Sequence, residues 1–165
     1  MKRSILTNAA LAAALALVVC GLFFAPKNRI FRLEVSLAAS IETHAQLFFD
    51  VGHGIREEDS ADRKVPAGGP TTLRFELPTG NYRHLRFDPL GMPGTATVSE
   101  LTLFSPTGAI LRRFRLADFQ PGSDLTVTPR PDGMTEIIAR NGDPMLDLPL
   151  PEPIVLRHRW TDFFS

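Results

Sequence analysis

The sequence predicts an all-β fold, an antiparallel β-sandwich preceded by one N-terminal transmembrane helix. Three features indicate this: stretches in which apolar and polar residues alternate, turn residues at short intervals, and one long uncharged segment near the N-terminus. Alternation with a period of two is typical of half-buried strands. All 14 prolines lie at or beyond Pro26, and prolines this dense break up long helices because each lacks a backbone donor.

The uncharged segment covers residues 4–26, a run of 23 residues. As a helix it would measure about 34 Å, against about 30 Å for the hydrocarbon core of a bilayer. We therefore expect residues 4–26 to be an uncleaved signal anchor that follows a short flank, residues 1–3. Phe23 and Pro26 disfavour cleavage after Ala25, because a cleavage site needs small residues there. A cleaved signal peptide and a lipid-modified Cys20 are the alternatives.

Positive charges lie on both sides of this segment and do not decide its orientation: Lys2 and Arg3 precede it, and Lys27, Arg29 and Arg32 follow it. The short N-terminal flank of a first hydrophobic segment commonly stays in the cytoplasm. We therefore expect a single-pass protein of the cytoplasmic (inner) membrane with its β domain outside the cytoplasm, in the periplasm. Residues 27–29 would then be a linker.

The β domain is expected over residues 30–155. Alternation predicts strands at residues 31–37, 45–51, 72–77, 83–88, 95–104, 109–116, 124–128 and 134–140. Helix is limited to single turns within residues 57–62 and 116–119.

Turn residues separate these strands. Residues 105–108 and 130–133 have the Pro and Gly positions of type I turns. Asn141 and Gly142 form the strongest short hairpin signal and predict a hairpin between residues 137–140 and 145–148.

Apart from the single helical turn within residues 57–62, residues 52–70 form the longest stretch without a predicted element. Gly52 and Gly54 flank His53 and let the backbone turn away after Asp50. A metal or sugar site could use Asp50, His53, Glu57, Glu58 or Asp59. The competing and favoured interpretation is a solvated loop, since these acidic residues do not follow the alternate-position pattern of a calcium loop.

Aromatic side chains are the other candidate contacts for a ligand. The chain has one Trp, Trp160, and one Tyr, Tyr82, against twelve phenylalanines, most of which we expect in the core. Phe48 shares a strand face with polar residues, so it is either an exposed contact point or part of a strand buried on both faces. The basic and aromatic tail, residues 156–165, packs as a last strand or lies near the membrane surface.

The stretch LRFDPLGMPGT, residues 85–95, places Arg86 and Asp88 on one strand face before two proline-glycine turns. Asp88 can accept a hydrogen bond from the turn backbone and pair with Arg86. We expect a structural role for Asp88, and we expect any ligand site on the face that it shares with Arg86.

Other functions are not supported by the sequence. Charges balance at 18 basic and 18 acidic residues, which argues against a nucleic-acid partner, and a single cysteine rules out an internal disulfide. The four histidines lack metal-ligand spacing, and no nucleophile elbow or phosphate-binding loop occurs. We therefore expect no catalytic residues, no metal and no cofactor: the chain is not predicted to be an enzyme.

Four motifs carry a resemblance: QLFFDVG at residues 46–52, LRFELP at 73–78, LRFDP at 85–89 and GTATVSELTL at 94–103. In this order they resemble the accessory β-sandwich found beside bacterial membrane glycosyltransferases and polysaccharide-assembly proteins. Such domains are similar to carbohydrate-binding modules of jelly-roll shape. The resemblance covers residues 31–116 and implies a jelly-roll-like fold. It departs from that setting because no glycosyltransferase domain follows.

Two function classes remain open. The first is a carbohydrate-recognition or glycan-assembly module of the cell envelope, for which Phe48, Tyr82 or Trp160 would be exposed around a concave face. The second is an interaction subunit that binds a membrane glycosyltransferase or another envelope protein through an apolar patch or an open strand edge.

Overall fold

The computed structural model describes residues 30–140 and 144–157. The predicted anchor at residues 4–26 and its flanks lie outside the described residues, as does Trp160. Within residues 30–140 and 144–157, no helix has both the length and the apolarity needed to cross a bilayer.

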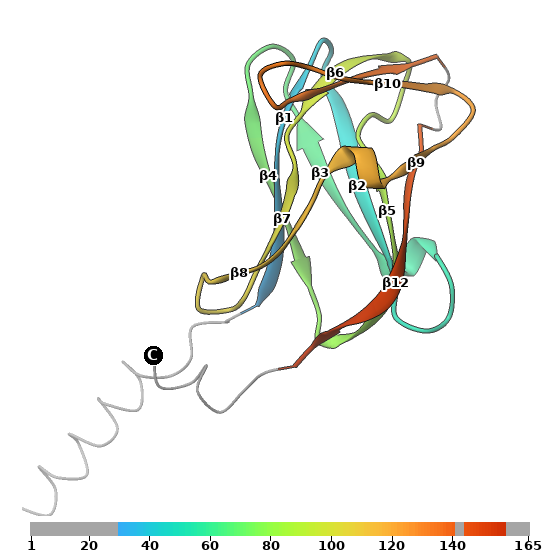
Figure 1. The fold of residues 1–165 in the computed structure, drawn as a ribbon. Coiled ribbons are helices and arrows are strands. Elements are labelled where there is room, and N and C mark those ends of the chain that lie inside the picture. Colours follow the sequence, from blue (N-terminus) through green and yellow to red (C-terminus); the bar gives the residue numbers. More distant parts are fainter. Residues whose placement is uncertain (1–29, 141–143, 158–165) are drawn as a thin grey trace, which may run out of the picture.

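Two antiparallel sheets face each other and enclose the core, so the expected β-sandwich is confirmed (Figure 1). The larger sheet has the order β10-β11-β6-β1-β7-β8, with β4 on the other side of β1, and the smaller has the order β3-β2-β5-β12-β9. The strands of the larger sheet are β1 (Phe31–Ala39), β4 (Thr71–Leu77), β6 (Gly94–Val98), β7 (Leu101–Phe104), β8 (Ile110–Phe114), β10 (Leu125–Pro129) and β11 (Thr135–Ala139). Those of the smaller sheet are β2 (Thr43–Asp50), β3 (Ser60–Val65), β5 (Gly80–Asp88), β9 (Gln120–Pro121) and β12 (Leu146–Leu156).

The alternation in the sequence sets the core. In β1 every second residue from Phe31 to Ala39 is buried, and the residues between them are half-buried. Six phenylalanines belong to the core cluster, which confirms the expectation for this residue type among the described residues. Phe75 and Phe87 reach across from the two sheets and meet edge to face, with 6.2 Å between the ring centroids. Such pairs add packing energy beyond the buried area.

The predicted strand over residues 95–104 is divided into β6 and β7. The break falls at Ser99 and Glu100, between the segments of this chain that pair with the two ends of β1. There the Ser36 amide donates to the Ser99 hydroxyl oxygen over 2.9 Å, while the Ser99 amide donates to the Ser36 carbonyl over 2.9 Å. A serine hydroxyl thus replaces one backbone acceptor of the ladder and lets the strand bend.

The expectation of a structureless stretch over residues 52–70 is wrong. A short 3₁₀ turn, η1 (Glu57–Asp59), leads into β3, which pairs with β2 along its length. β3 was missed because it is an edge strand whose outward side chains are charged, as is common for sheet edges. Its sequence therefore reads like a solvated loop. The other predicted helical turn is present as η2 (Leu116–Asp118).

The turns at residues 105–108 and 130–133 are confirmed. The Gly108 amide donates to the Ser105 carbonyl over 3.0 Å, and the Gly133 amide donates to the Arg130 carbonyl over 3.2 Å.

The predicted hairpin around Asn141 and Gly142 is wrong, because its two flanking strands belong to different sheets. β11 pairs with β10 and β6, whereas β12 pairs with β5 and β9. The two strands therefore lie in different layers of the sandwich, and neither pairs with the other.

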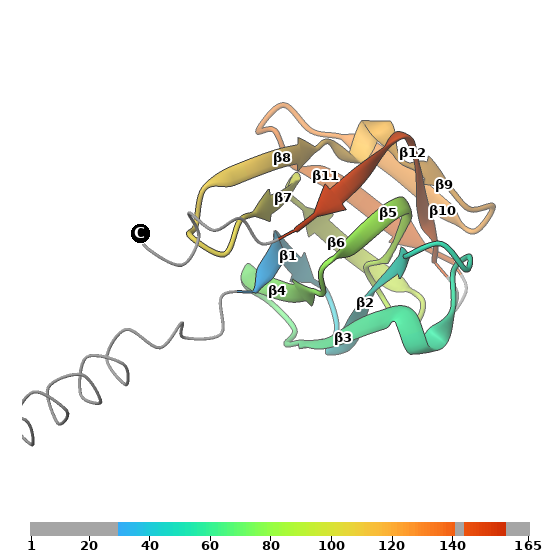
Figure 2. The same ribbon diagram turned by 90° about the horizontal axis from the view of Figure 1, so that it is seen from below.

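Both ends of the described chain lie at one end of the sandwich (Figures 1 and 2). Phe31, which opens β1, is paired with the last residue of β4, and Arg32 is paired with Phe104 at the end of β7. Leu156, which closes β12, is paired with Gly80 at the start of β5. We call this end, formed by the start of β1, the β7–β8 hairpin and the end of β12, the basal end.

Candidate functional site

The outer face of the smaller sheet carries a row of polar side chains that strand register brings together. Gln46 of β2 is paired with Asp62 of β3 on one side and with Asp88 of β5 on the other. In the next row of this face, Phe48 lies between Ser60 and Arg86. Residues that are far apart in the sequence therefore meet on one surface.

A hollow of about 290 Å³ opens on this face. Its polar wall comes from β2, β3, β5 and the η1 turn, and its apolar wall from Phe48, Leu90 and Pro144. The polar lining residues are His44, Gln46, Glu57, Asp62, Arg86 and Asp88. A few convergent polar groups around an apolar floor are typical of small-ligand sites, and the volume is at the small end of their range.

Arg86 and Asp88 form a two-pronged ion pair in this hollow. The Nε and Nη2 atoms of Arg86 donate to the two carboxylate oxygens of Asp88 over 2.9 and 2.6 Å. The guanidinium also lies over the Phe48 ring, 4.8 Å from its centroid. The expected pairing of Asp88 with Arg86 is confirmed. Two parallel hydrogen bonds and the contact with the Phe48 ring define the orientation of the guanidinium.

A hydrogen bond joins the predicted turn after Asp88 to β2. The Gly91 amide, at its fourth position, donates to the hydroxyl oxygen of Thr43 over 2.9 Å. Thr43 is almost fully buried at the start of β2, so this bond fixes the loop that carries Leu90 into the hollow.

Hydrogen bonds also join the other polar side chains that line the hollow. The Gln46 amide nitrogen donates to Glu57 Oε1 over 2.6 Å and to Ser60 Oγ over 2.9 Å. Beside it, His44 Nδ1 lies 2.8 Å from Asp62 Oδ1. These contacts hold His44, Gln46, Glu57 and Asp62 in place along the lining of the hollow. Carboxylate oxygens, an amide and an imidazole can accept from or donate to the hydroxyls of a ligand.

Asp50, Gly52 and His53 lie at the end of β2, outside the lining of the hollow. Asp50 Oδ1 accepts hydrogen bonds from the amides of Gly52 and Gly54 over 2.7 and 2.8 Å. The Gly52 amide is the largest cause that holds the pKa of the Asp50 carboxyl below its ordinary value. Asp50 thus organises the loop, and His53 is exposed on it.

Tyr82 is buried with only 1% of its surface exposed, contrary to the exposure expected for a sugar-stacking residue. Its hydroxyl donates to the Pro78 carbonyl, its ring meets Phe49 edge to face, and burial raises the pKa of its phenol. The ring lies in the core because Tyr82 occupies a core-facing position of β5. Phe48 is also buried, at 5% exposed, beneath Arg86.

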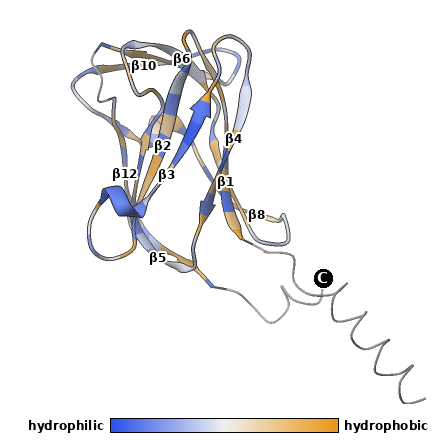
Figure 3. Cartoon of the chain, turned by 180° about the vertical axis from the view of Figure 1, so that it is seen from behind, coloured by the Kyte–Doolittle hydropathy of each residue, from blue (hydrophilic) through white to orange (hydrophobic). Residues whose placement is uncertain are grey.

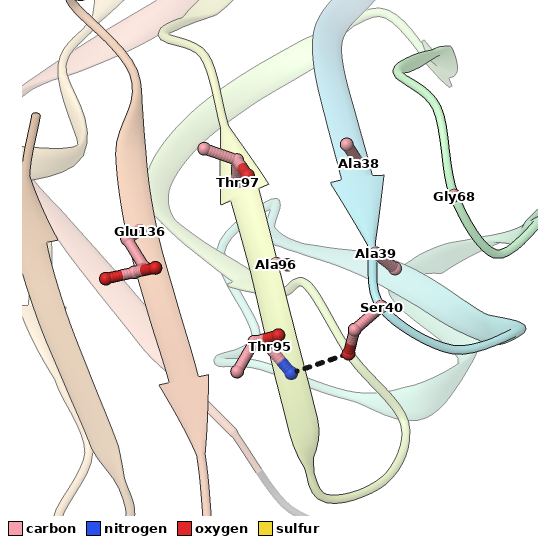
Figure 4. A pocket seen from close by; sticks show the side chains of 8 residues that line it. All are labelled: Ala38, Ala39, Ser40, Gly68, Thr95, Ala96, Thr97 and Glu136. Carbon is pink, nitrogen blue, oxygen red and sulfur yellow. Dashed lines mark hydrogen bonds between the residues drawn. The ribbon is translucent and has the colours of Figure 1, made fainter.

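A second hollow of about 240 Å³ lies on the outer face of the larger sheet (Figure 4). Small side chains from β1 and β6 line it, and Glu136 of β11 is its single charged residue. The Thr95 amide donates to the Ser40 hydroxyl across its rim over 3.1 Å. This hollow offers no cation and no ring, so the hollow at Arg86 is the better candidate site.

The predicted site residues therefore divide into those that meet and those that do not. Phe48, Arg86 and Asp88 come together in the hollow, whereas Asp50, Gly52, His53 and Tyr82 do not, and Trp160 is outside the described residues. Sequence reasoning did not single out His44, Gln46, Asp62, Leu90 or Pro144 as site residues, because strand register decides their meeting. Among the residues that the structure describes, no cluster of three His, Cys, Asp or Glu side chains could hold a metal ion.

Comparison with protein families, curated proteins and solved structures finds no match to this chain.

Proposed function

We propose that this chain is a non-catalytic, membrane-anchored β-sandwich module of the bacterial cell envelope that recognises a glycan. In this proposal residues 4–26 span the inner membrane, the jelly-roll-like β domain lies in the periplasm, and the glycan occupies the hollow on the outer face of the smaller sheet. The module would hold glycan near a membrane glycosyltransferase or another assembly protein.

The hollow carries this proposal. It combines an amide, an imidazole, a guanidinium and three carboxylates with an apolar floor, and the hydrogen bonds and ion pairs among these groups preorganise them. Sugar hydroxyls both donate and accept hydrogen bonds, so they fit a wall that offers carboxylate oxygens beside nitrogen donors. Preorganised partners limit the ordering cost of binding. Since Phe48 is covered by Arg86, the ligand would contact the guanidinium plane in place of a bare aromatic ring.

The experiment is a screen of envelope glycans against the full chain in nanodiscs, with one variant inside the hollow and a matched one outside. Gln46→Ala removes an amide that lines the hollow, and Gln120→Ala removes an exposed amide of β9 in the same sheet. Loss of one hydrogen-bonding side chain costs about 1 kcal/mol or more, which is at least about fivefold in Kd. We expect weaker binding for Gln46→Ala and unchanged binding for Gln120→Ala. Equal effects of the two substitutions, or no glycan binding by the wild-type chain, would contradict the proposal.

The second candidate function is an interaction subunit, and the exposed strand β8 favours it. β8 is an edge strand of the larger sheet, and its first two residues, Ile110 and Leu111, are each 49% exposed. Exposed apolar side chains that lie together are common in protein-binding surfaces. Co-purification of an envelope protein with the wild-type chain, lost on Leu111→Asp, together with the absence of glycan binding, would favour this second function.

A further inference from the structure

The basal end of the sandwich carries an apolar and basic surface that the hollow does not use. We define this basal patch as Ile110, Leu111 and Arg112 of β8 with Val155 and Arg157 at the end of β12. We propose that the basal patch rests on the lipid bilayer and inserts its apolar side chains between anionic headgroups. This inference rests on the proposed membrane anchor, but it does not depend on glycan recognition.

Exposure singles out the basal patch. Five large apolar side chains are exposed among the described residues, and three of them are Ile110 at 49%, Leu111 at 49% and Val155 at 51%. All three lie near the basal end. Ile110 of β8 is paired with Phe104 at the end of β7, and Val155 of β12 is paired with Asn81 near the start of β5. In Figure 3 the β8 hairpin lies beside the place where the described chain begins. Apolar side chains gathered at one end of a domain mark a contact surface.

The local backbone of β8 turns Leu111 outward. In the β7–β8 pairing, Leu103 is opposite Arg112 and Phe104 is opposite Ile110, so Leu111 is the extra residue of a β-bulge. A bulge re-aims a side chain and stops further strand pairing. A bulge at the edge strand therefore disfavours another strand as the partner of β8, and a flexible lipid surface does not need a regular strand edge.

The length of the connecting chain places the basal end at the membrane. Three residues, 27–29, separate the uncharged segment from residue 30, the first that the structure describes. Fully extended, three residues reach only about 10 Å. If residues 4–26 span the bilayer, Phe31 must start close to the membrane surface, and the β7–β8 hairpin lies beside it because Arg32 is paired with Phe104.

The charges of the basal patch complement anionic headgroups. Arg112 lies over the Phe114 ring, 5.3 Å from its centroid, and Arg157 is exposed at the end of the described chain. Neither forms an ion pair with a carboxylate of the described residues. The pKa of Asp118 is held below its ordinary value chiefly by its hydrogen bond with Arg115, and the charge of Arg112 adds to this effect. Basic side chains next to exposed aliphatic ones are typical of surfaces that bind anionic membranes. The residues that follow, Arg159 and Trp160, are of the kinds found at membrane interfaces.

The test measures where Leu111 lies relative to the bilayer. Cys20→Ser removes the single cysteine of the full chain, and Leu111→Cys then allows one nitroxide spin label in the basal patch. Met92→Cys is the matched control: Met92 is 45% exposed and follows β5 at the opposite end of the sandwich, where β1 ends beside β6. Both chains are reconstituted into vesicles of phosphatidylglycerol and phosphatidylcholine, and collisions of the label with oxygen and with a water-soluble nickel chelate are measured.

We expect the label at position 111 to lose most of its collisions with the nickel chelate and to gain collisions with oxygen, whereas the label at position 92 stays fully accessible to the chelate. Arg112→Glu in the position-111 chain should return part of the chelate collisions. Matching circular dichroism melts of the labelled chains exclude unfolding as the cause.

Three results would overturn the inference. Equal chelate access at both positions would show that the basal patch faces water. Shielding of position 111 from both oxygen and chelate would show that protein covers it, either the tail or a partner, and spin–spin broadening would identify a second copy. A chain that does not float with the vesicles at all refutes the proposed anchor itself, which distinguishes that failure from failure of the basal contact.

Discussion

Removing the carboxylate of Asp88 should destabilise the β domain by about 2–3 kcal/mol. Asp88 is almost buried, and the side chains of Asp88 and Arg86 are only 11% and 20% exposed. Exposed ion pairs contribute about 0–1 kcal/mol, whereas truncating one partner of a fully buried pair costs about 3–5 kcal/mol. This pair lies between these cases. The retained contact of Arg86 with the Phe48 ring at 4.8 Å keeps the cost below the upper value.

The assay is thermal unfolding of the full chain in detergent, followed by circular dichroism. For a domain of this size each kcal/mol shifts Tm by roughly 4 °C, so Asp88→Ala should lower Tm by about 8–12 °C. Asp132→Ala is the matched control, because Asp132 pairs with Arg130 over 3.3 Å at side-chain exposures of 50% and 45%. We expect that control to change Tm by at most a few degrees.

A double-mutant cycle with Arg86→Met isolates the pair from other effects of each substitution. The two substitutions should be clearly non-additive, since either one alone breaks the same ion pair. Additive effects, or an unchanged Tm for Asp88→Ala combined with lost glycan binding, would refute the structural role and make Asp88 a ligand-contacting residue.

Three further predictions concern other polar contacts. The single tyrosine, Tyr82, should titrate above the ordinary pKa of a phenol because it is buried. Its contribution to stability is therefore present below the ordinary pKa and is lost as the pH rises through the folded-state pKa. Ultraviolet titration measures this pKa, and a midpoint at the ordinary value would contradict the prediction. Asp50 should titrate below its ordinary pKa. Its contribution to the order of the loop at Gly52 is therefore present above the ordinary pKa and disappears as the pH falls through the folded-state pKa. Carbon NMR of the carboxyl measures this pKa, and a value at or above the ordinary one argues against the prediction. Ser99→Ala should destabilise the domain by about 1–2 kcal/mol because the Ser36 amide loses its acceptor. Hydrogen exchange should then be faster at Ser36, and unchanged protection there would refute the role of the Ser99 hydroxyl at the break between β6 and β7.

The sequence predicts the sandwich well where one face of a strand is buried and the other is not. In β1 the residues alternate strictly, so both the strand and its buried face can be predicted from Phe31 onward. Edge strands are harder to predict from alternation. β3 has charged outward residues and pairs with β2 alone, so its alternation of apolar and polar residues is weak. A local pattern does not show which strands pair when they are far apart in the sequence. Asn141 and Gly142 therefore predicted a hairpin that the two sheets do not form.

The candidate site was predictable in part for the same reason. Arg86 and Asp88 share a face because they are two residues apart on one strand, and Phe48 could be placed on the matching face of its own strand. That Gln46 is paired with Asp88 depends on the β2–β5 register, which no local pattern specifies. The sequence suggested an exposed Tyr82 because tyrosines that bind sugars are exposed. In the structure the ring is buried, and its hydroxyl donates to the Pro78 carbonyl inside the domain.

The most direct test of the proposed function is amide chemical-shift mapping of the full chain in nanodiscs with the strongest glycan from the screen. We expect shifts that cluster on β2, β3 and β5 around Gln46 and Arg86. These shifts should disappear for Gln46→Ala but persist for Gln120→Ala. Shifts centred on the hollow at Thr97 of the larger sheet, or shifts spread evenly over the domain, would contradict the account.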